Sequence, residues 1–247
     1  MKAISIIGFP KSGKTTVCEI ITSGLCNRGY TVGSIKDIQS DFVFDYNPTS
    51  NKQKLEDAQQ VTIRSLSETD ILYQSMLPVN LILKHYDQDF VILEDIVECN
   101  APRIITAISE QDILELTDNL VIAVSGIFAN QHDGEINGLP IFNALEHSDS
   151  LVDFVIENAF EPLPNFDAEC CSACGYSCRE MAELIAHHKA LHSDCILSNQ
   201  RVELLINDKP IKMVPFVQNI LRNAVMGVVS ELQGYAKNSN IKVRFKL

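Results

Sequence analysis

Long apolar runs, internal repeats and low-complexity tracts are all missing from this chain of 247 residues. No segment reaches the roughly 18 consecutive apolar residues that a membrane-spanning helix needs. The first residues pass from a short apolar run directly into Gly8, Phe9, Pro10 and Lys11, which is not the pattern of a secretory signal peptide. We therefore expect a cytoplasmic protein without membrane segments, in a compartment where thiols stay reduced.

Basic residues are scarce relative to acidic ones. The chain has 20 Lys and Arg against 32 Asp and Glu, a formal net charge of −12, and no run of four or more Lys or Arg. Because an acidic protein repels the phosphate backbone, we expect no nucleic-acid partner. The hydrophobic content of 46% is ordinary for a globular protein and argues against extensive disorder.

Short apolar runs alternate with amphipathic segments over residues 1–160. This alternation predicts an α/β fold with a parallel sheet flanked by helices. The expected strands are 3–8, 31–36, 90–94, 103–108 and 120–125. The expected helices are 14–28, 54–66, 78–86 and 149–159.

A phosphate-binding motif lies between the first expected strand and the first expected helix. Residues 8–15, Gly-Phe-Pro-Lys-Ser-Gly-Lys-Thr, match G-x-x-x-x-G-K-[ST] in full. This motif is called the P-loop. Its backbone N–H groups and the N-terminus of the helix that follows face the phosphates, and its lysine contacts the β- and γ-phosphates. The residues expected to bind the nucleotide are Gly8, Lys11, Ser12, Gly13, Lys14, Thr15, Thr16 and Asp37.

A Mg²⁺ ion is expected to accompany the nucleotide, with the Thr15 hydroxyl as one ligand. The apolar strand 90–93 ends in Glu94 and Asp95, which suits the Walker B position. Glu94 is the first choice for the acidic ligand and Asp95 the second, while Asp37 is a candidate outer ligand. The expected catalytic residues are Lys14, Thr15 and Glu94. No guanine-reading N/T-K-x-D element is present in usable form, so the residues leave GTP and ATP open.

Five of the eight cysteines fall between residues 170 and 195. Thiolates at this density in a reducing compartment indicate a soft-metal or iron–sulfur site. A [4Fe–4S] cluster is the favoured interpretation; structural zinc is the alternative, supported by three nearby histidines. Redox thiols or chance clustering form a third interpretation. The assigned ligands are Cys171, Cys174, Cys178 and Cys195, with Cys170 as a spare or an alternative.

The composition divides the chain into three parts. Residues 1–163 are the expected nucleotide-binding domain, 164–200 a cysteine-rich module, and 201–247 a small β-β-α-β unit. In this last unit the expected strands are 202–206, 211–214 and 241–247, the expected turn is 207–210, and the expected helix is 216–232. The apolar residues of that helix either pack against its own strands or form a homodimer interface.

Five segments resemble a known family: the P-loop with the strand before it, the sequence 33–37 (Gly-Ser-Ile-Lys-Asp), residues 44–45 (Phe-Asp), the expected helix over 54–65, and the apolar strand ending in Glu94. They are similar to the molybdopterin-guanine dinucleotide biosynthesis adaptor family, MobB. Asp37 stands where the family usually has His, and Asp95 stands where it has Gly. The resemblance implies a P-loop NTPase fold and a GTP-binding adaptor with weak GTPase activity at most. It also implies a partner protein from molybdenum-cofactor biosynthesis, or a molybdoenzyme.

The segment 171–195 is in turn similar to small [4Fe–4S] modules of the form C-x-x-C-G-x-x-x-C with a distal cysteine. A nucleotide motif and a cysteine set on one chain leave two other functions open. An NTP-dependent metallochaperone or cluster carrier would use hydrolysis to release a labile cluster. A redox-gated regulator would change its nucleotide affinity between the oxidised and the reduced cluster.

Overall fold

The computed structural model describes residues 1–38, 59–64, 66–73, 75–163 and 174–195, and parts of 202–241 (202, 204–206, 209–211, 213, 215–233, 235–236 and 241). The chain divides into two compact units. The first contains Met1–Asn165 and Cys178–His192, and the second contains Phe166–Ser177 and Ser193–Leu247. Part of the expected cysteine-rich module thus groups with the nucleotide-binding domain.

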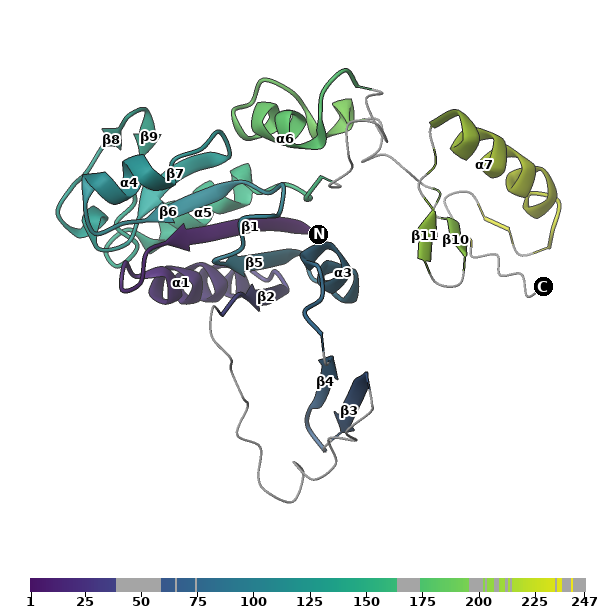
Figure 1. Cartoon of the computed structure of the whole chain (residues 1–247), viewed down its shortest axis with the longest axis horizontal. Helices are drawn as coiled ribbons and strands as arrows, with labels where there is room; N and C mark the ends of the chain where they lie inside the picture. Colours follow the sequence, from purple (N-terminus) through teal and green to yellow (C-terminus); the bar gives the residue numbers. More distant parts are fainter. Residues whose placement is uncertain are drawn as a thin grey trace. The chain divides into compact units, whose positions relative to one another are not determined.

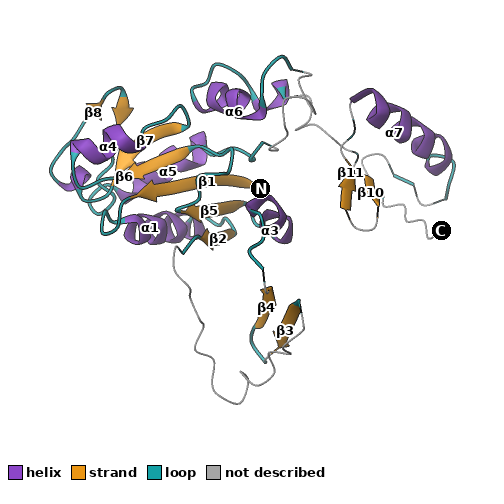
Figure 2. Cartoon of the chain, in the orientation of Figure 1, coloured by secondary structure: helices purple, strands orange, loops and turns teal. Residues whose placement is uncertain are grey.

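A parallel sheet of five strands forms the centre of the first unit, in the order β2-β5-β1-β6-β7 (Figures 1 and 2). All of its strand pairs are parallel. Strands β5, β6 and β7 are buried at every position, which explains the apolar runs 90–93 and 121–124 in the sequence. The strands are β1 Lys2–Gly8, β2 Val32–Lys36, β5 Phe90–Glu94, β6 Arg103–Thr106 and β7 Val121–Ser125. They confirm the α/β fold and the five expected strands.

Helices cover both faces of this sheet. Ala3 clusters with Val79 of α3, and Ile7 clusters with Ile113 of α4. Because alternate residues of a strand point to the same face, α3 and α4 cover one side of β1. Helix α1 packs against strands β1 and β5 of the sheet and also against helix α5. The helices are α1 Lys14–Asn27, α3 Val79–Ile82, α4 Glu110–Leu116 and α5 Ser148–Asn158.

The sequence-based prediction of a helix over 54–66 is wrong for the residues that the structure describes. Residues Gln60–Arg64 form strand β3, which pairs antiparallel with β4, Thr69–Tyr73. Three consecutive β-branched residues, Val, Thr and Ile, lie in β3 and favour an extended backbone over a helix. The expected helix 78–86 is shorter, because α3 passes into a 3-10 turn, η1, over Leu83–His85.

Several short elements complete the first unit. Helix α4 begins at a capping box in which Ser109 and Asp112 satisfy each other's backbone N–H groups. After β7 come the 3-10 turn η2, Phe128–Asn130, and the small hairpin of β8, Glu135–Ile136, and β9, Leu139–Pro140. Helix α6 spans Cys178–Ala186 and begins at one of the expected cysteine ligands.

The described residues of the second unit include a hairpin and a long helix. Strands β10, Leu204–Ile206, and β11, Lys209–Ile211, pair antiparallel, and α7 spans Pro215–Val229. The expected turn over 207–210 extends too far, because β11 already begins at Lys209. The expected strand 241–247 lies outside the described residues apart from Ile241. A 3-10 turn, η3, covers His192–Asp194.

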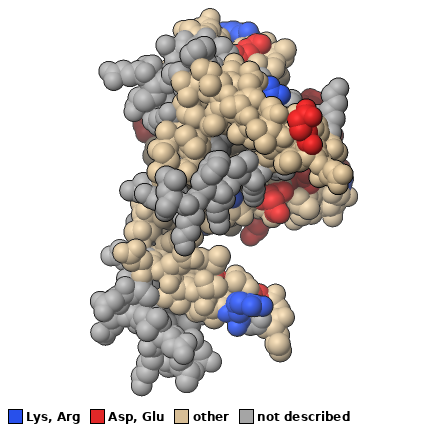
Figure 3. All heavy atoms as spheres, turned by 90° about the vertical axis from the view of Figure 1, so that its right-hand side faces the viewer, with Lys and Arg blue, Asp and Glu red and all other residues tan. Residues whose placement is uncertain are grey.

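None of the helices in the described part of the chain combines the length and the apolarity needed to cross a membrane. Figure 3 shows one face, on which the visible Lys and Arg side chains of the described residues lie as separate spots. This distribution agrees with the excess of acidic residues in the sequence.

Candidate nucleotide-binding site

The P-loop connects the end of β1 at Gly8 to the start of α1 at Lys14. Lys11 and Gly13 have positive φ angles of 67° and 101°, so the chain turns sharply before the helix. The Ser12 side chain is buried and hydrogen-bonded to Thr106 Oγ1 at 2.7 Å. The loop is therefore anchored to β6 beneath it, and the N-terminus of α1 faces the carboxyl edge of the sheet.

The ammonium group of Lys14 lies over this loop. Its Nζ donates hydrogen bonds to the carbonyl oxygens of Gly8 at 2.6 Å and of Phe9 at 3.0 Å. It also forms an ion pair with Asp95 Oδ2 at 3.3 Å. Burial raises the pKa of Asp95, and the charge of Lys14 opposes that rise. Lys14 thus lies where a P-loop lysine reaches phosphate oxygens.

Glu94 and Thr15 meet at the end of β5. Thr15 Oγ1 donates a hydrogen bond of 2.8 Å to Glu94 Oε1, and Glu94 is buried. Lys36 Nζ donates to the same Oε1 at 2.8 Å and to Thr15 Oγ1 at 3.3 Å. Hydroxyl and carboxylate oxygens are the donors that Mg²⁺ prefers, and an ammonium group already contacts both of them. The residues present therefore fit a Mg²⁺ ion, which Thr15 and Glu94 would hold.

Asp95 and Asp37 lie beside this pair, and backbone hydrogen bonds hold both of them in place. The Asp95 N–H donates to Ile6 O at 3.0 Å, and the Asp37 N–H donates to Glu94 O at 3.0 Å. Asp95 has a φ of 61°, in the left-handed region that is unfavourable for most residues other than glycine. The glycine that the resembling family has at this position suits the same backbone conformation.

A pocket of about 430 Å³ opens above the P-loop. One wall consists of the loop and the first turn of α1: Lys11, Gly13, Lys14, Thr15, Thr16 and Val17. The opposite wall comes from the segments after β7: Gly126, Ile127, Asn130, Ala144 and Leu145.

Sequence reasoning missed this second wall. Gly126 and Ile127 follow the carboxyl end of an expected strand, where ligands of parallel sheets bind, and this was the available signal. Leu145 has no comparable signal, because its place depends on how a distant loop folds back.

The second wall also supports the P-loop directly. The Ile127 N–H donates to the Ser12 carbonyl oxygen at 3.1 Å. A Cβ atom on Gly126 would lie 2.4 Å from that same oxygen, and Gly126 has a φ of +83°. A side chain larger than hydrogen cannot be accommodated there without moving the loop.

The expected cysteine ligands are distributed over both units and beyond the described residues. Cys171 lies outside the described residues, Cys174 and Cys195 belong to the second unit, and Cys178 begins α6 in the first. Among the residues that the structure describes, no group of three or more His, Cys, Asp and Glu side chains could hold a metal ion. The four-cysteine site stays a prediction.

The three histidines near these cysteines form hydrogen bonds to the P-loop domain. The Nε2 atoms of His187 and His192 donate to the carbonyl oxygens of Asn119 and Glu161, at 3.0 Å and 2.9 Å. His188 Nε2 donates to Asn158 Oδ1 at 3.1 Å. In the described geometry these contacts help to attach the segment around α6 to the rest of the first unit.

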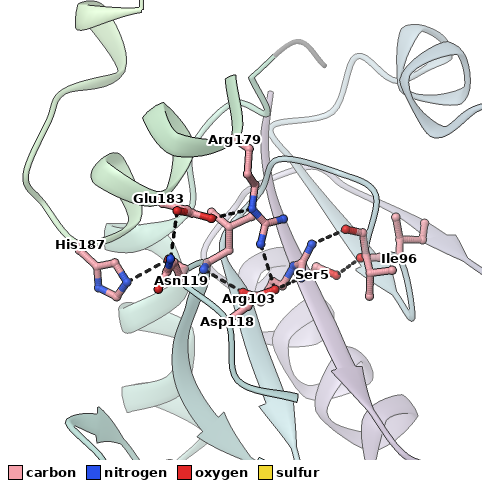
Figure 4. Close-up of polar contacts among 10 residues, drawn as sticks. Ser5, Ile96, Arg103, Asp118, Asn119, Arg179, Glu183 and His187 are labelled. Carbon is pink, nitrogen blue, oxygen red and sulfur yellow. Dashed lines mark hydrogen bonds and ion pairs between the residues drawn. The ribbon is translucent and has the colours of Figure 1, made fainter. Parts of the chain in front are cut away.

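A network of charged side chains strengthens that attachment (Figure 4). Arg179 of α6 forms ion pairs with Asp118, at 3.0 Å, and with Glu183, at 2.9 Å. Asp118 also pairs with the buried Arg103, whose guanidinium donates to Val97 O in the loop that follows Glu94. A continuous chain of contacts thus joins the helix that begins at Cys178 to the loop after the Walker B strand.

The parallel sheet, with its P-loop between β1 and α1, defines a P-loop NTPase fold. The model of the family described as "Molybdopterin guanine dinucleotide synthesis protein B", MobB, matches residues 3–126, half of the chain. The chain belongs to the MobB family.

Similar proteins cover different shares of the chain. A protein of Methanocaldococcus jannaschii, described as "Putative molybdopterin-guanine dinucleotide biosynthesis adapter protein", is 25% identical over 250 residues. That match covers 98% of this chain and 97% of the relative. Two solved structures of Bacillus subtilis MobB have TM-scores of 0.54 and 0.51 at 18% and 19% identity. Each covers 65% of this chain and 99% of the solved chain, and these likenesses concern the fold alone.

Proposed function

We propose that this protein is a GTP-binding adaptor in the biosynthesis of molybdopterin guanine dinucleotide. The observation that carries the proposal is the pocket above the P-loop, lined by Lys14 and by Thr15, which is hydrogen-bonded to Glu94, in a chain of the MobB family. The description of the M. jannaschii relative, which matches along nearly the whole chain, supports the same pathway.

In this proposal the P-loop binds the phosphates through its backbone N–H groups and through Lys14. Thr15 and Glu94 hold Mg²⁺, which neutralises phosphate charge when bound. Ile127 and Leu145, both exposed apolar side chains on the pocket wall, provide a surface on which a purine base can pack. Hydrolysis is weak at most, and the main activity is to present the nucleotide to a partner enzyme of molybdenum-cofactor biosynthesis.

Nucleotide binding is tested with fluorescent GTP and ATP analogues in the presence of Mg²⁺. We expect saturable binding that is lost in Lys14→Ala, since the motif lysine contacts the β- and γ-phosphates. Lys189→Ala is the matched control, because this exposed lysine is not among the residues that line the pocket. Tighter binding of ATP than of GTP would contradict the guanine assignment while leaving the P-loop assignment intact.

The cellular role is tested in a strain of the source organism that lacks the protein. We expect reduced activity of enzymes that require molybdopterin guanine dinucleotide, restored by the wild-type chain and not by Lys14→Ala. Unchanged molybdoenzyme activity in the deletion strain would refute the adaptor role.

We also propose that Cys171, Cys174, Cys178 and Cys195 bind a [4Fe–4S] cluster. The spacing of the cysteines supports this proposal, and the thiolate chemistry of the set suits iron–sulfur ligation. Anaerobic purification, followed by absorbance and by assays for iron, zinc and acid-labile sulfide, tests it. About four irons and four sulfides per chain are expected. One zinc without sulfide would instead make the module structural and remove the redox alternatives.

One observation favours a redox-gated regulator as a second candidate function. The contacts from Arg179 through Asp118 and Arg103 reach Val97 O, three residues beyond the Walker B glutamate. A change at Cys178 could shift α6 and, through these contacts, the loop beside the nucleotide. This candidate requires the affinity for GTP to differ between the oxidised and the reduced cluster, and equal affinities would exclude it.

A further inference from the structure

Lys36 occupies an unusual place for a lysine at the end of a strand. It is the last residue of β2 and is paired in register with Glu94 of β5. Its Nζ contacts both oxygens that would hold Mg²⁺: Glu94 Oε1 at 2.8 Å and Thr15 Oγ1 at 3.3 Å. The ammonium group of Lys14 pairs with Asp95 instead. Each of the two carboxylates therefore has its own lysine.

Charge explains why Lys36 lies there. The Glu94 side chain is 8% exposed, and a buried carboxylate without a nearby cation is strongly unfavourable. Lys36 supplies that cation, while its own side chain remains 46% exposed.

A Mg²⁺ ion held by Thr15 and Glu94 would compete with Lys36 for Glu94 Oε1 and Thr15 Oγ1. Two cations held side by side repel each other, and each needs the same oxygens. When Mg²⁺ enters with a nucleotide, the ammonium group must therefore move. Its stem is flexible and half-exposed, so the side chain can rotate toward other anionic groups at the same edge of the sheet.

We propose that Lys36 is an exchangeable cation that makes the site selective for nucleoside triphosphates. Before loading, its ammonium group neutralises Glu94; after loading, it contacts the terminal phosphate of a triphosphate. Mg²⁺ bound together with a diphosphate would also displace Lys36 from Glu94, but a diphosphate has no γ-phosphate oxygens for the ammonium group to contact. This inference rests on the proposed function in one respect, that the P-loop binds nucleotide with Mg²⁺.

The test compares GDP with a non-hydrolysable GTP analogue, the β,γ-imido triphosphate, on the full-length chain. Affinities for both are measured by titration calorimetry, together with the Mg²⁺ concentration that half-saturates GDP binding. The variants are Lys36→Met and Lys36→Gln, which remove the charge, and Lys36→Arg, which keeps it. Lys189→Met is the control for loss of one positive charge elsewhere, and circular dichroism checks that each variant is folded.

The wild-type chain is expected to prefer the triphosphate. Loss of one charge-assisted hydrogen bond in Lys36→Met and Lys36→Gln should reduce that preference by about 10-fold to 100-fold. The half-saturating Mg²⁺ concentration should fall by about 2-fold to 5-fold, because the competing ammonium is gone. The change is small because the Lys36 side chain is 46% exposed and solvent screens its charge. Lys36→Arg should retain the preference, and Lys189→Met should match the wild type.

The outcomes separate this inference from the proposed function. If the wild type binds nucleotide but Lys36→Met and Lys36→Gln keep both its triphosphate preference and its Mg²⁺ requirement, the role of Lys36 is refuted alone. If the wild type binds no nucleotide, the proposed function fails and this inference fails with it.

Discussion

Replacing Gly126 with alanine tests whether the segment after β7 supports the P-loop. In the structure a Cβ atom at this position would lie 2.4 Å from Ser12 O, 2.9 Å from Thr106 Cβ and 3.1 Å from Ala107 N. These neighbours are backbone atoms and a packed side chain of the buried strand edge, so they cannot simply rotate away. The substitution must displace either the P-loop or the segment that carries Gly126.

Gly134 provides a matched control, because it has nearly the same backbone conformation without the crowding. Its φ is +81°, against +83° for Gly126, and nothing lies within 4 Å of a Cβ atom built there. Both alanine variants should lose about 1–2 kcal/mol from left-handed strain. Gly126→Ala should lose a further amount of about 1–3 kcal/mol from overpacking.

Urea unfolding followed by circular dichroism measures the free energy of unfolding of both variants. We expect Gly126→Ala to be clearly less stable than Gly134→Ala and also to bind nucleotide more weakly, since the displaced segment contacts the P-loop. Equal loss of stability in the two variants, with unchanged nucleotide affinity, would show that the tight contact between Gly126 and Ser12 is not real.

Three further predictions concern other parts of the first unit. Asp118→Asn should lower the free energy of unfolding by about 1–3 kcal/mol, because it leaves a buried guanidinium without its carboxylate. The exposed ion pair between Arg28 and Asp149 provides the comparison. Its removal should lower the free energy of unfolding by less than about 1 kcal/mol. Ser109→Ala should cost about 1 kcal/mol in the same assay through loss of the α4 N-cap, and no measurable cost would contradict the capping box. Burial raises the pKa of the Cys18 thiol from 9.0 to about 12, so mass spectrometry after iodoacetamide treatment at pH 8 should find Cys26 alkylated and Cys18 protected. Because the pKa of the Cys18 thiol is higher in the folded state, its contribution to stability is intact below pH 9 and is lost between pH 9 and about 12. Alkylation of Cys18 in the folded chain at pH 8 would argue against its burial.

Local patterns predicted most of the central fold. Strands β5 and β7 contain short apolar runs because both of their faces are covered by other elements. The P-loop is recognisable in the sequence because its glycines and its Lys-Thr pair lie close together, in a single turn between β1 and α1. The prediction failed at Gln60–Arg64. The sequence pattern was interpreted as an amphipathic helix, but these residues form a strand that pairs with β4.

The candidate site was only partly predictable. Thr15 and Glu94 could each be identified from a motif or a strand end, but their hydrogen bond depends on β5 lying beside β1. Lys36 was not assigned a role from the sequence, because its contact with Glu94 follows from the register of β2 on β5. The pocket wall at Leu145 comes from a loop far along the chain.

The sequence by itself determined that this protein has a P-loop on a parallel sheet, an acidic strand end beside it and a dense set of cysteines. Those features depend on residues that are close together in the chain. Tertiary structure alone decided which cation contacts Glu94, which segments form the second wall of the pocket, and how Arg179 on α6 connects to Asp118. The reason is physical: strand order, register and helix docking bring together residues that are distant in sequence, and no local pattern encodes those distances.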